Sequence, residues 1–360
     1  MNSTCSTPIK EANHKDRIIT FDLLRIIAAF AVVILHVSAR NWHNSFPSTE
    51  WEIRNLYDTT VRWSVPIFVM ISGALFLDSS KSLSLSRLYK KNMLRIVVAF
   101  LFWSIIYTLF FSFRKRCWGN YNNYLISIIN GPVHLWFLKM LLGLYVIIPL
   151  LKEFVVKRSL ELYFIFLSLI TTFILPMVIE AIGLLNPHLA TILNNNINQI
   201  GLNVAVGYSG YFVLGHYLYN NSICRHHRMV IYFLAIISFL CVGLSTHLYS
   251  HHSNQPEEYF YSYLNIFTLI EATGVFLFFK YSFTHLSPTT QHAIILVSNC
   301  SFGIYLIHLM LIEILFRFFL TSNGMLQIVL IPLFSLLVFV LSFFIIIFLR
   351  KIPLFRKYAT

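Results

Sequence analysis

Ten long apolar stretches divide this chain of 360 residues, and they constrain its fold more than any other feature. A membrane core about 30 Å thick is crossed by roughly 20 apolar residues in a helix. The stretches are too long for strands and lack the alternation of a barrel. We therefore predict an all-α integral membrane protein, a bundle of about ten transmembrane helices. The expected spans are 18–39, 63–78, 93–113, 134–151, 160–180, 200–219, 229–249, 260–280, 293–319 and 325–349.

The distribution of lysine and arginine predicts the orientation of the bundle, because cytoplasmic loops are enriched in these residues. With the N-terminus in the cytoplasm, the inside segments hold 17 basic residues and the outside loops hold 6. Arg114, Lys115 and Arg116 form the one local exception. We expect both termini in the cytoplasm, with a tail at 1–17, a single transmembrane domain at 18–349 and a second tail at 350–360.

Composition excludes several classes of protein. Charged residues make up 11% of the chain and hydrophobic residues 57%, whereas a soluble domain carries about a quarter charged residues. The 27 basic residues lie in short loops between apolar stretches, so they do not indicate a nucleic-acid partner. Five scattered cysteines without a CxxC pair predict neither a disulfide framework nor a metal site. The absence of P-loop, GxGxxG, HExxH and GxSxG motifs leaves an ATP-driven pump or a soluble-type hydrolase without support.

Three ionisable residues interrupt the first apolar stretch: Asp22, Arg25 and His36. Eleven residues separate Arg25 from His36, which places both within ~20° of one helix face and ~16 Å apart along the axis. Asp22 and Arg25 are spaced to form an ion pair. The plain explanation is a pair that reaches the headgroups and a histidine at the far interface. Three such residues on one face favour a functional role.

Other polar residues lie at the ends of later stretches. Ser72 and Gly73 suit close packing of helices. Lys90, Lys91 and Arg95 precede or open the third stretch, where they would contact solvent, lipid headgroups or a phosphate-bearing ligand.

A further group of residues is expected near the outer face or within the bundle. His134 and Trp136 open the fourth stretch, with His134 at the same depth as His36, and His308 lies near the middle of the membrane. Aromatic residues are normal at an interface. For Glu271, Glu313 and Arg317 we expect a role in helix packing, the last two pairing at i,i+4. Four histidines are expected in solvated loops: His226, His227, His251 and His252.

These residues resemble the acyltransferase-3 family of multi-pass membrane acyltransferases. Family members carry a basic residue, ten intervening positions and a histidine in the first span, here Arg25 and His36. The resemblance continues over nearly the whole chain, through SVPIFVMISGALFL (64–77), HLWFLKMLLGLYVIIPLL (134–151), GYFVLGHYL (210–218) and SFGIYLIHLM (301–310). It is strongest to short members without an extracytoplasmic domain, of the enterobacterial-common-antigen O-acetyltransferase type. Many relatives have two arginines three apart in the third span, where this chain has Asn92 and Arg95.

The resemblance implies an O-acyltransferase of the bacterial cytoplasmic membrane. It would move an acetyl or other short acyl group from cytoplasmic acyl-CoA to a hydroxyl of a cell-surface or lipid-linked glycan. Acetyl-CoA would be a substrate, with no permanently bound cofactor. The donor's phosphates would bind Arg95, Lys91 and Lys90, and His36 would be a general base or a nucleophile, with Asp22 holding Arg25. The remaining candidates for the acceptor or the oxyanion are Ser72, His134, Trp136 and His308.

Two other classes of function remain. An exporter or flippase of a polysaccharide intermediate would use Asp22, Glu271 and His308 as a proton relay, although no inverted repeat is evident. A structural subunit would use its buried charges only to fix helix packing. Transfer of label from acyl-CoA separates the enzyme from both alternatives.

Overall fold

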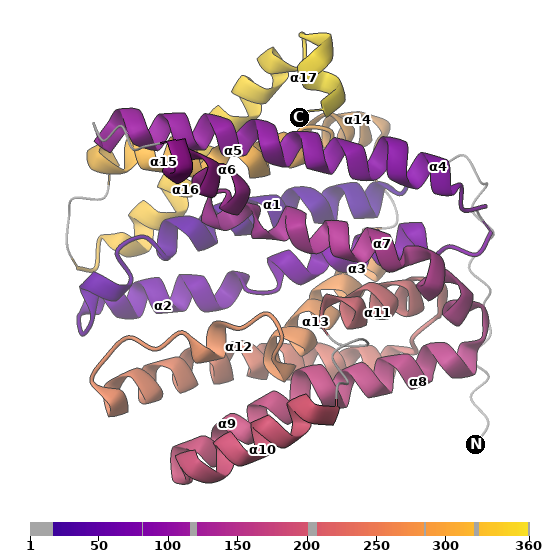
Figure 1. Ribbon diagram of the computed structural model, residues 1–360, viewed down its shortest axis with the longest axis vertical. Helices are drawn as coiled ribbons and strands as arrows, with labels where there is room; N and C mark the ends of the chain where they lie inside the picture. The colour runs from indigo at the N-terminus through magenta and orange to yellow at the C-terminus, as the bar shows by residue number, and fades with distance from the viewer. Residues whose placement is uncertain are drawn as a thin grey trace.

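The computed structural model describes residues 17–80, 82–115, 121–200, 207–283, 286–319 and 324–358, and these residues form helices, turns and loops without a β-strand. The long helices run side by side across Figure 1. The first half of the chain contains α1 (Ile19–Ser38), α2 (Thr49–Val61), α3 (Ser64–Phe76), α4 (Leu85–Arg87), α5 (Leu94–Lys115), α6 (Tyr121–Asn130), α7 (Trp136–Val156) and α8 (Arg158–Ser168). The second half contains α9 (Leu175–Leu185), α10 (Pro187–Ile200), α11 (Tyr208–Asn220), α12 (Arg225–Ser253), α13 (Ile266–Ser282), α14 (Pro288–Ser298), α15 (Ser301–Phe319), α16 (Gln327–Leu349) and α17 (Pro353–Tyr358).

Short non-α segments join or extend several of these helices. Three are 3₁₀ turns: η1 (His43–Ser45), η3 (Val133–Leu135) and η6 (Tyr259–Tyr261). Two are π-helical and continue directly into α-helices: η2 (Leu88–Met93) before α5 and η4 (Leu169–Ile174) before α9. The π-helical turns are local irregularities of the kind often found near functional sites.

Eight helical segments in the described part of the chain are long and apolar enough to cross a membrane. A ninth results if α14 and α15, which meet at 54°, count as one bent span. The predicted multi-pass bundle is therefore confirmed, with eight or nine candidate spans in the described residues where the sequence predicted about ten. The sixth predicted stretch, 200–219, contains only the 13 residues of α11 in the described region. The second predicted span is the end of a longer segment, Thr49–Phe76, so most of the expected outer loop at 40–62 is helical.

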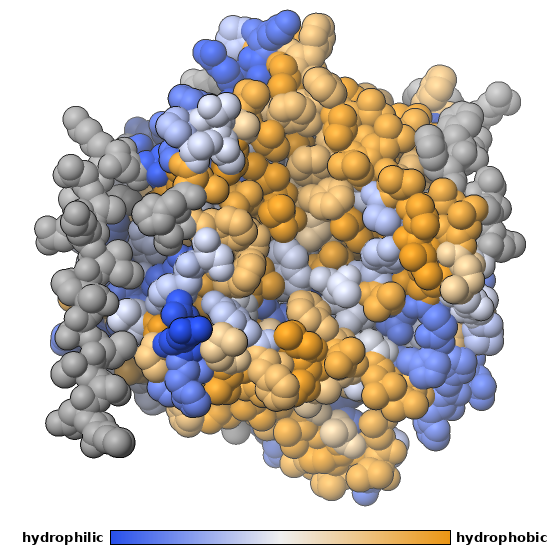
Figure 2. All heavy atoms as spheres, turned by 180° about the vertical axis from the view of Figure 1, so that it is seen from behind, coloured by the Kyte–Doolittle hydropathy of each residue, from blue (hydrophilic) through white to orange (hydrophobic). Residues whose placement is uncertain are grey.

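Helix α1 is the central helix of the bundle and packs against α2, α3, α13, α14, α15 and α16. Its small and branched residues Ala28, Val33 and Val37 are completely buried. Large apolar side chains on the outer helices remain exposed, for example Leu101 on α5 and Leu240 on α12. Figure 2 shows this apolar surface over much of one face, with hydrophilic residues gathered toward its margins. Such a surface is the one that lipid covers.

The two short helices α3 and α11 contact each other backbone to backbone. A Cβ atom on Gly73 would lie 1.8 Å from the carbonyl oxygen of Phe212, and one on Gly215 would lie 2.2 Å from that of Met70. Neither helix tolerates a larger residue at its glycine, because the approaching atoms belong to the partner backbone. The packing role expected for Gly73 is therefore confirmed, and Gly215 has the same role on α11.

Candidate active site

Three histidines from separate parts of the sequence meet in the bundle. His36 lies in the last turn of α1, His134 in η3, and His308 in α15. The ring centroids of His36 and His308 are 5.1 Å apart, those of His134 and His308 5.4 Å, and those of His36 and His134 6.2 Å. His134 and His308 are buried, whereas His36 is partly exposed. His36 is thus the least enclosed member of this histidine cluster.

Hydrogen bonds to carbonyl groups define the tautomers of the two buried rings. His308 Nδ1 lies 2.6 Å from the carbonyl oxygen of Tyr305, and His134 Nε2 lies 3.4 Å from that of Leu306. A carbonyl oxygen only accepts, so we assign the proton to each of these nitrogens. His308 Nε2 and His134 Nδ1 are then lone-pair acceptors, and no described residue supplies a donor to either. Buried acceptors of this kind are rare, and a hydroxyl group would satisfy them.

Two tyrosines connect α15, the helix of His308, to the segments beside it. The hydroxyl of Tyr305 donates to the carbonyl of His134. The hydroxyl of Tyr107 donates to the carbonyl of Leu306 over 3.0 Å and accepts from the amide of Met310, also over 3.0 Å. Sequence reasoning missed both residues, since a tyrosine in an apolar stretch carries no signal of its partner.

A cavity of about 400 Å³ lies near the start of α1 and is lined by three arginines: Arg17, Arg25 and Arg95. Its lining residues, all in the described part of the chain, include no acidic side chain. The others are Phe76, Asn92, Ile96, Leu141, Tyr145, Ser298, Asn299, Ser301 and Phe302. Lys90 and Lys91 are exposed on η2 and are not lining residues. The structure thus brings Arg25 and Arg95 to one cavity, with Asn92 beside them.

The buried carboxylate of Asp22 organises this group of arginines. It pairs with Arg17 in a two-pronged contact and accepts hydrogen bonds from Ser298 at 2.7 Å and Arg25 at 3.4 Å. Arg17 also donates to the side-chain oxygen of Asn299 over 2.9 Å. A buried carboxylate needs such partners. The pairing of Asp22 with Arg25 is as expected, but Arg17 lies in the predicted tail, where no sequence signal pointed to it.

A second cavity, of about 160 Å³, continues from the first. Its lining shares four residues with the larger cavity: Arg25, Leu141, Ser301 and Phe302. Its other lining residues are Val32, Val65, Phe68, Ser72, Phe137 and Tyr305. Val32 lies one helical turn before His36, and Tyr305 one turn before His308. A cationic chamber and an apolar one thus follow each other along α1 and end beside the histidine cluster, although His36 is not itself a lining residue.

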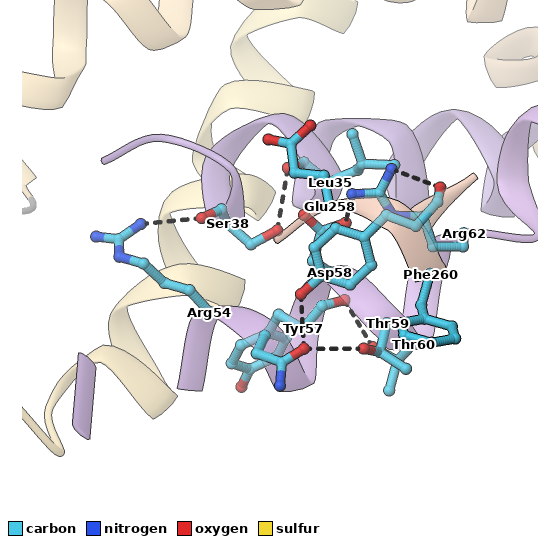
Figure 3. A network of polar contacts seen from close by, with 12 residues as sticks. Leu35, Ser38, Arg54, Tyr57, Asp58, Thr59, Thr60, Arg62, Glu258 and Phe260 are labelled. Atoms are coloured by element: carbon cyan, nitrogen blue, oxygen red, sulfur yellow. Dashed lines mark hydrogen bonds and ion pairs between the residues drawn. The ribbon is translucent and has the colours of Figure 1, made fainter. Parts of the chain in front are cut away.

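Beyond the histidine cluster, Arg54 of α2 caps the end of α1 (Figure 3). Its guanidinium is completely buried and donates to the carbonyls of Val37 and Ser38 at 3.3 Å each and of Arg40 at 2.6 Å. Glu50 holds it from the other side at 2.8 Å. A cation at a helix C-terminus complements the helix dipole. Arg54 therefore fixes the turn of α1 that carries His36.

The same helix carries a second ion pair near the site. Arg62 and Asp58 approach to 2.5 Å, and Arg62 donates to the carbonyl of Tyr261 over 3.2 Å (Figure 3). The guanidinium also lies 4.1 Å from the centroid of the Tyr261 ring. The predicted loop at 40–62 therefore contributes a polar helix, which sequence reasoning did not expect.

Trp136 belongs to a group of partly exposed aromatic rings. Its ring centroid lies 5.7 Å from that of Tyr263, nearly parallel to it, and 5.6 Å from that of Tyr208. Ser72, by contrast, lines the smaller cavity, where its hydroxyl donates to the carbonyl of Phe68 over 2.7 Å.

Two acidic residues expected to serve packing have different surroundings. Glu313 pairs with Arg40 and, at 2.5 Å, with Arg114, whose position breaks the charge bias of the loops. The side chain of Arg317, the expected partner of Glu313, lies outside the described residues. Glu271 is completely buried, and its carboxylate has no hydrogen-bond partner among the described residues.

Comparison with known families assigns the chain to a family. A family model described as an acyltransferase domain, that of the acyltransferase-3 family, matches residues 18–350. No curated protein and no solved structure matches the sequence. The family match spans all of the apolar helices and both cavities apart from Arg17. The chain therefore belongs to the acyltransferase-3 family and is a multi-pass membrane acyltransferase.

Proposed function

We propose that this protein is an O-acyltransferase that moves an acetyl or other short acyl group from cytoplasmic acyl-CoA to a hydroxyl of a cell-surface or lipid-linked glycan. The observation that carries the proposal is the succession of two cavities along α1. The first is lined by three arginines, the second is apolar, and they share Arg25 as a lining residue. This order of charge and apolarity matches acyl-CoA, which has an anionic phosphate end and an uncharged arm.

The arginine-lined cavity is the donor site in this proposal. Arg17, Arg25 and Arg95 offer planar, permanently charged groups, which suit phosphate oxygens better than lysine does. Lys90 and Lys91 lie exposed on the preceding segment and add positive charge outside the cavity. The arm of the donor then occupies the apolar cavity. The rise of α1 from Arg25 to His36 is ~16 Å, which lets an extended arm bring its thioester near the histidines.

His36 is the proposed catalytic group, and two routes fit. As general base, its ring nitrogen takes the proton of the acceptor hydroxyl while the oxygen attacks the thioester carbonyl. The carbon–sulfur bond then breaks, and the departing thiolate receives the proton from the imidazolium. As nucleophile, the nitrogen itself displaces the thiolate and holds the acyl group. The acceptor oxygen later takes that group from the ring, and its proton passes to the thiolate. Histidine suits both routes, because a neutral imidazole has one nitrogen with a free lone pair.

The tautomers of the buried histidines favour a role in binding the acceptor. His134 Nδ1 and His308 Nε2 each accept a hydrogen bond. They therefore suit the hydroxyl group of an incoming sugar better than a negatively charged oxygen, which needs donors. Ser72 lines the apolar cavity and would supply an oxyanion hydrogen bond after rotating away from Phe68. The ring of Trp136, together with the adjacent rings of Tyr208 and Tyr263, offers an aromatic surface on which a sugar ring can stack.

The test is incubation of purified protein with acetyl-CoA labelled in the acetyl group, together with a glycan fraction from the source cells. We expect label in the glycan with the wild type and none with His36→Ala. His226→Ala, an exposed histidine on α12, is the matched control and should behave as the wild type. Label on the wild-type protein itself, released when acceptor glycan is added, identifies the nucleophile route.

Full activity of His36→Ala removes His36 from the mechanism. Absence of label, combined with vectorial movement of glycan in vesicles, supports the exporter instead.

A further inference from the structure

Two histidines and one carboxylate meet where the first turn of α2 approaches the last turns of α12. Glu52 Oε1 lies 2.7 Å from His247 Nδ1 and 3.4 Å from His251 Nε2. The three potential ligand atoms all lie within 4.8 Å of one another. We propose that Glu52, His247 and His251 form a binding site for one divalent transition-metal ion of the Zn²⁺ type.

The ligand set is the one that zinc prefers. Zn²⁺ binds imidazole nitrogen and carboxylate oxygen at about 2.0–2.2 Å, usually with four ligands. His247 and His251 stand four residues apart on α12, so both rings project from one face, as in helical zinc motifs. One carboxylate oxygen already lies close to both nitrogens, and small rotations of the three side chains direct them to a common point. A water molecule would complete the coordination, which leaves one position open.

The surroundings hold the rings and still admit an ion. The side chains of His247, His251 and Glu52 are 39%, 44% and 40% exposed, so an ion enters directly from the aqueous phase. The two imidazole centroids lie 4.5 Å apart. Phe46 and Trp51 pack against His251 with centroid distances of 5.2 and 5.9 Å, which limits the rotation of that ring. Pre-oriented ligands lower the cost of forming the site.

This site is separate from the cavities and from the histidine cluster, and it does not depend on the proposed activity. Its ligands connect α2 with α12, two helices that lie beside each other in Figure 1. Sequence reasoning considered only cysteine patterns and HExxH for metals and expected His251 in a loop. The structure corrects that expectation, since His226, His227, His251 and His252 all lie within α12. The histidine pair gains its carboxylate only from a helix almost 200 residues earlier in the chain.

The experiment is a Zn²⁺ titration of the purified full chain in detergent, followed by calorimetry after removal of any polyhistidine tag. We expect one saturable ion per chain. His247→Ala, His251→Ala and the nearly isosteric Glu52→Gln should each weaken binding at least about tenfold, because even outer-shell changes at metal sites cost that much. His252→Ala is the matched control, since it removes an exposed neighbour of His251 that is not a ligand. It should bind Zn²⁺ as the wild type does.

Thermal unfolding is a second measurement, which reports whether the bound ion connects α2 with α12. Saturating Zn²⁺ should raise the unfolding temperature of the wild type and of His252→Ala, and EDTA should reverse the shift. The shift at a given Zn²⁺ concentration should be smaller in Glu52→Gln than in the wild type. The unfolding temperature of each variant in EDTA is its own reference, and the Zn²⁺ shift is measured from that reference. The proposal is overturned by non-saturable binding, or by a loss in His252→Ala as large as that in His251→Ala.

Discussion

The imidazole of His36 lies 5.1 Å from that of His308, although the first belongs to the N-terminal helix and the second to α15 near the end of the chain. The two rings differ in their surroundings. His308 is completely buried and hydrogen-bonded through Nδ1, whereas His36 is partly exposed. In the proposed mechanism, His36 is therefore the group that reacts and His308 the group that supports it.

His308→Phe tests this division of roles. The change keeps a flat ring of similar size but removes the acceptor Nε2, so we expect the turnover rate to fall about tenfold or more, the usual effect of one lost buried hydrogen bond. The loss should be smaller than for His36→Ala, where general acid–base chemistry worth about 10²–10⁴ disappears. Steady-state acetyl transfer by equal amounts of detergent-purified protein is the measurement. Equal losses in both variants would contradict separate roles.

Arg17→Ala tests the donor site with a residue that the sequence did not single out. Removing it takes one of three arginines from the larger cavity and one partner from Asp22. We expect the KM for acetyl-CoA to rise about tenfold, in the range of a charged hydrogen bond, with a smaller change in the turnover rate. Lys90→Ala is the matched control, because Lys90 is a nearby cation that does not line the cavity. An equal rise in KM for Lys90→Ala would argue against the cavity as the donor site.

The sequence predicted the class of fold well, because hydropathy records directly which segments a membrane accepts. Within the predicted span 200–219, the described helix α11 begins only at Tyr208, directly after Gly207, which has a φ of 93°. Apolar composition does not reveal where a helix begins. The pairing of α11 with α3 through Gly73 and Gly215 is likewise a tertiary fact.

The candidate site was predictable only where its residues share one helix. The spacing of Asp22, Arg25 and His36 follows from helical geometry, and the structure keeps all three on α1. Arg17 lies just before α1, five residues from Asp22, a spacing that helical periodicity does not single out. His308 joins these residues through a contact between distant segments, which no periodicity encodes. For the same reason Arg54 was counted only as a basic residue of an outer loop, although it caps the helix that carries His36.

Arg54→Met tests that cap. Methionine fills much of the space but leaves the carbonyls at the end of α1 and the carboxylate of Glu50 without their partner. Removing one member of a buried ion pair costs about 3–5 kcal/mol, so we expect a markedly lower unfolding temperature. The double variant Arg54→Met/Glu50→Gln, which removes both charges, should recover part of that loss. Thermal unfolding followed by circular dichroism measures both. A double variant no more stable than the single one would mean that the carbonyl contacts, not the pair, dominate.

Gly215→Ala tests the contact between α3 and α11. The added methyl group would lie 2.2 Å from the carbonyl oxygen of Met70, so the two backbones must separate. Overpacking of this kind costs typically about 1–3 kcal/mol, and a backbone neighbour cannot rotate away. We expect less folded protein in the membrane and a lower unfolding temperature. Gly143→Ala on α7 is the matched control, since nothing lies within 4 Å of its added methyl group. Alanine is more favourable than glycine in a helix by about 1 kcal/mol, so this variant should be at least as stable as the wild type. Equal stability of the two variants would show that α3 and α11 do not pack backbone to backbone.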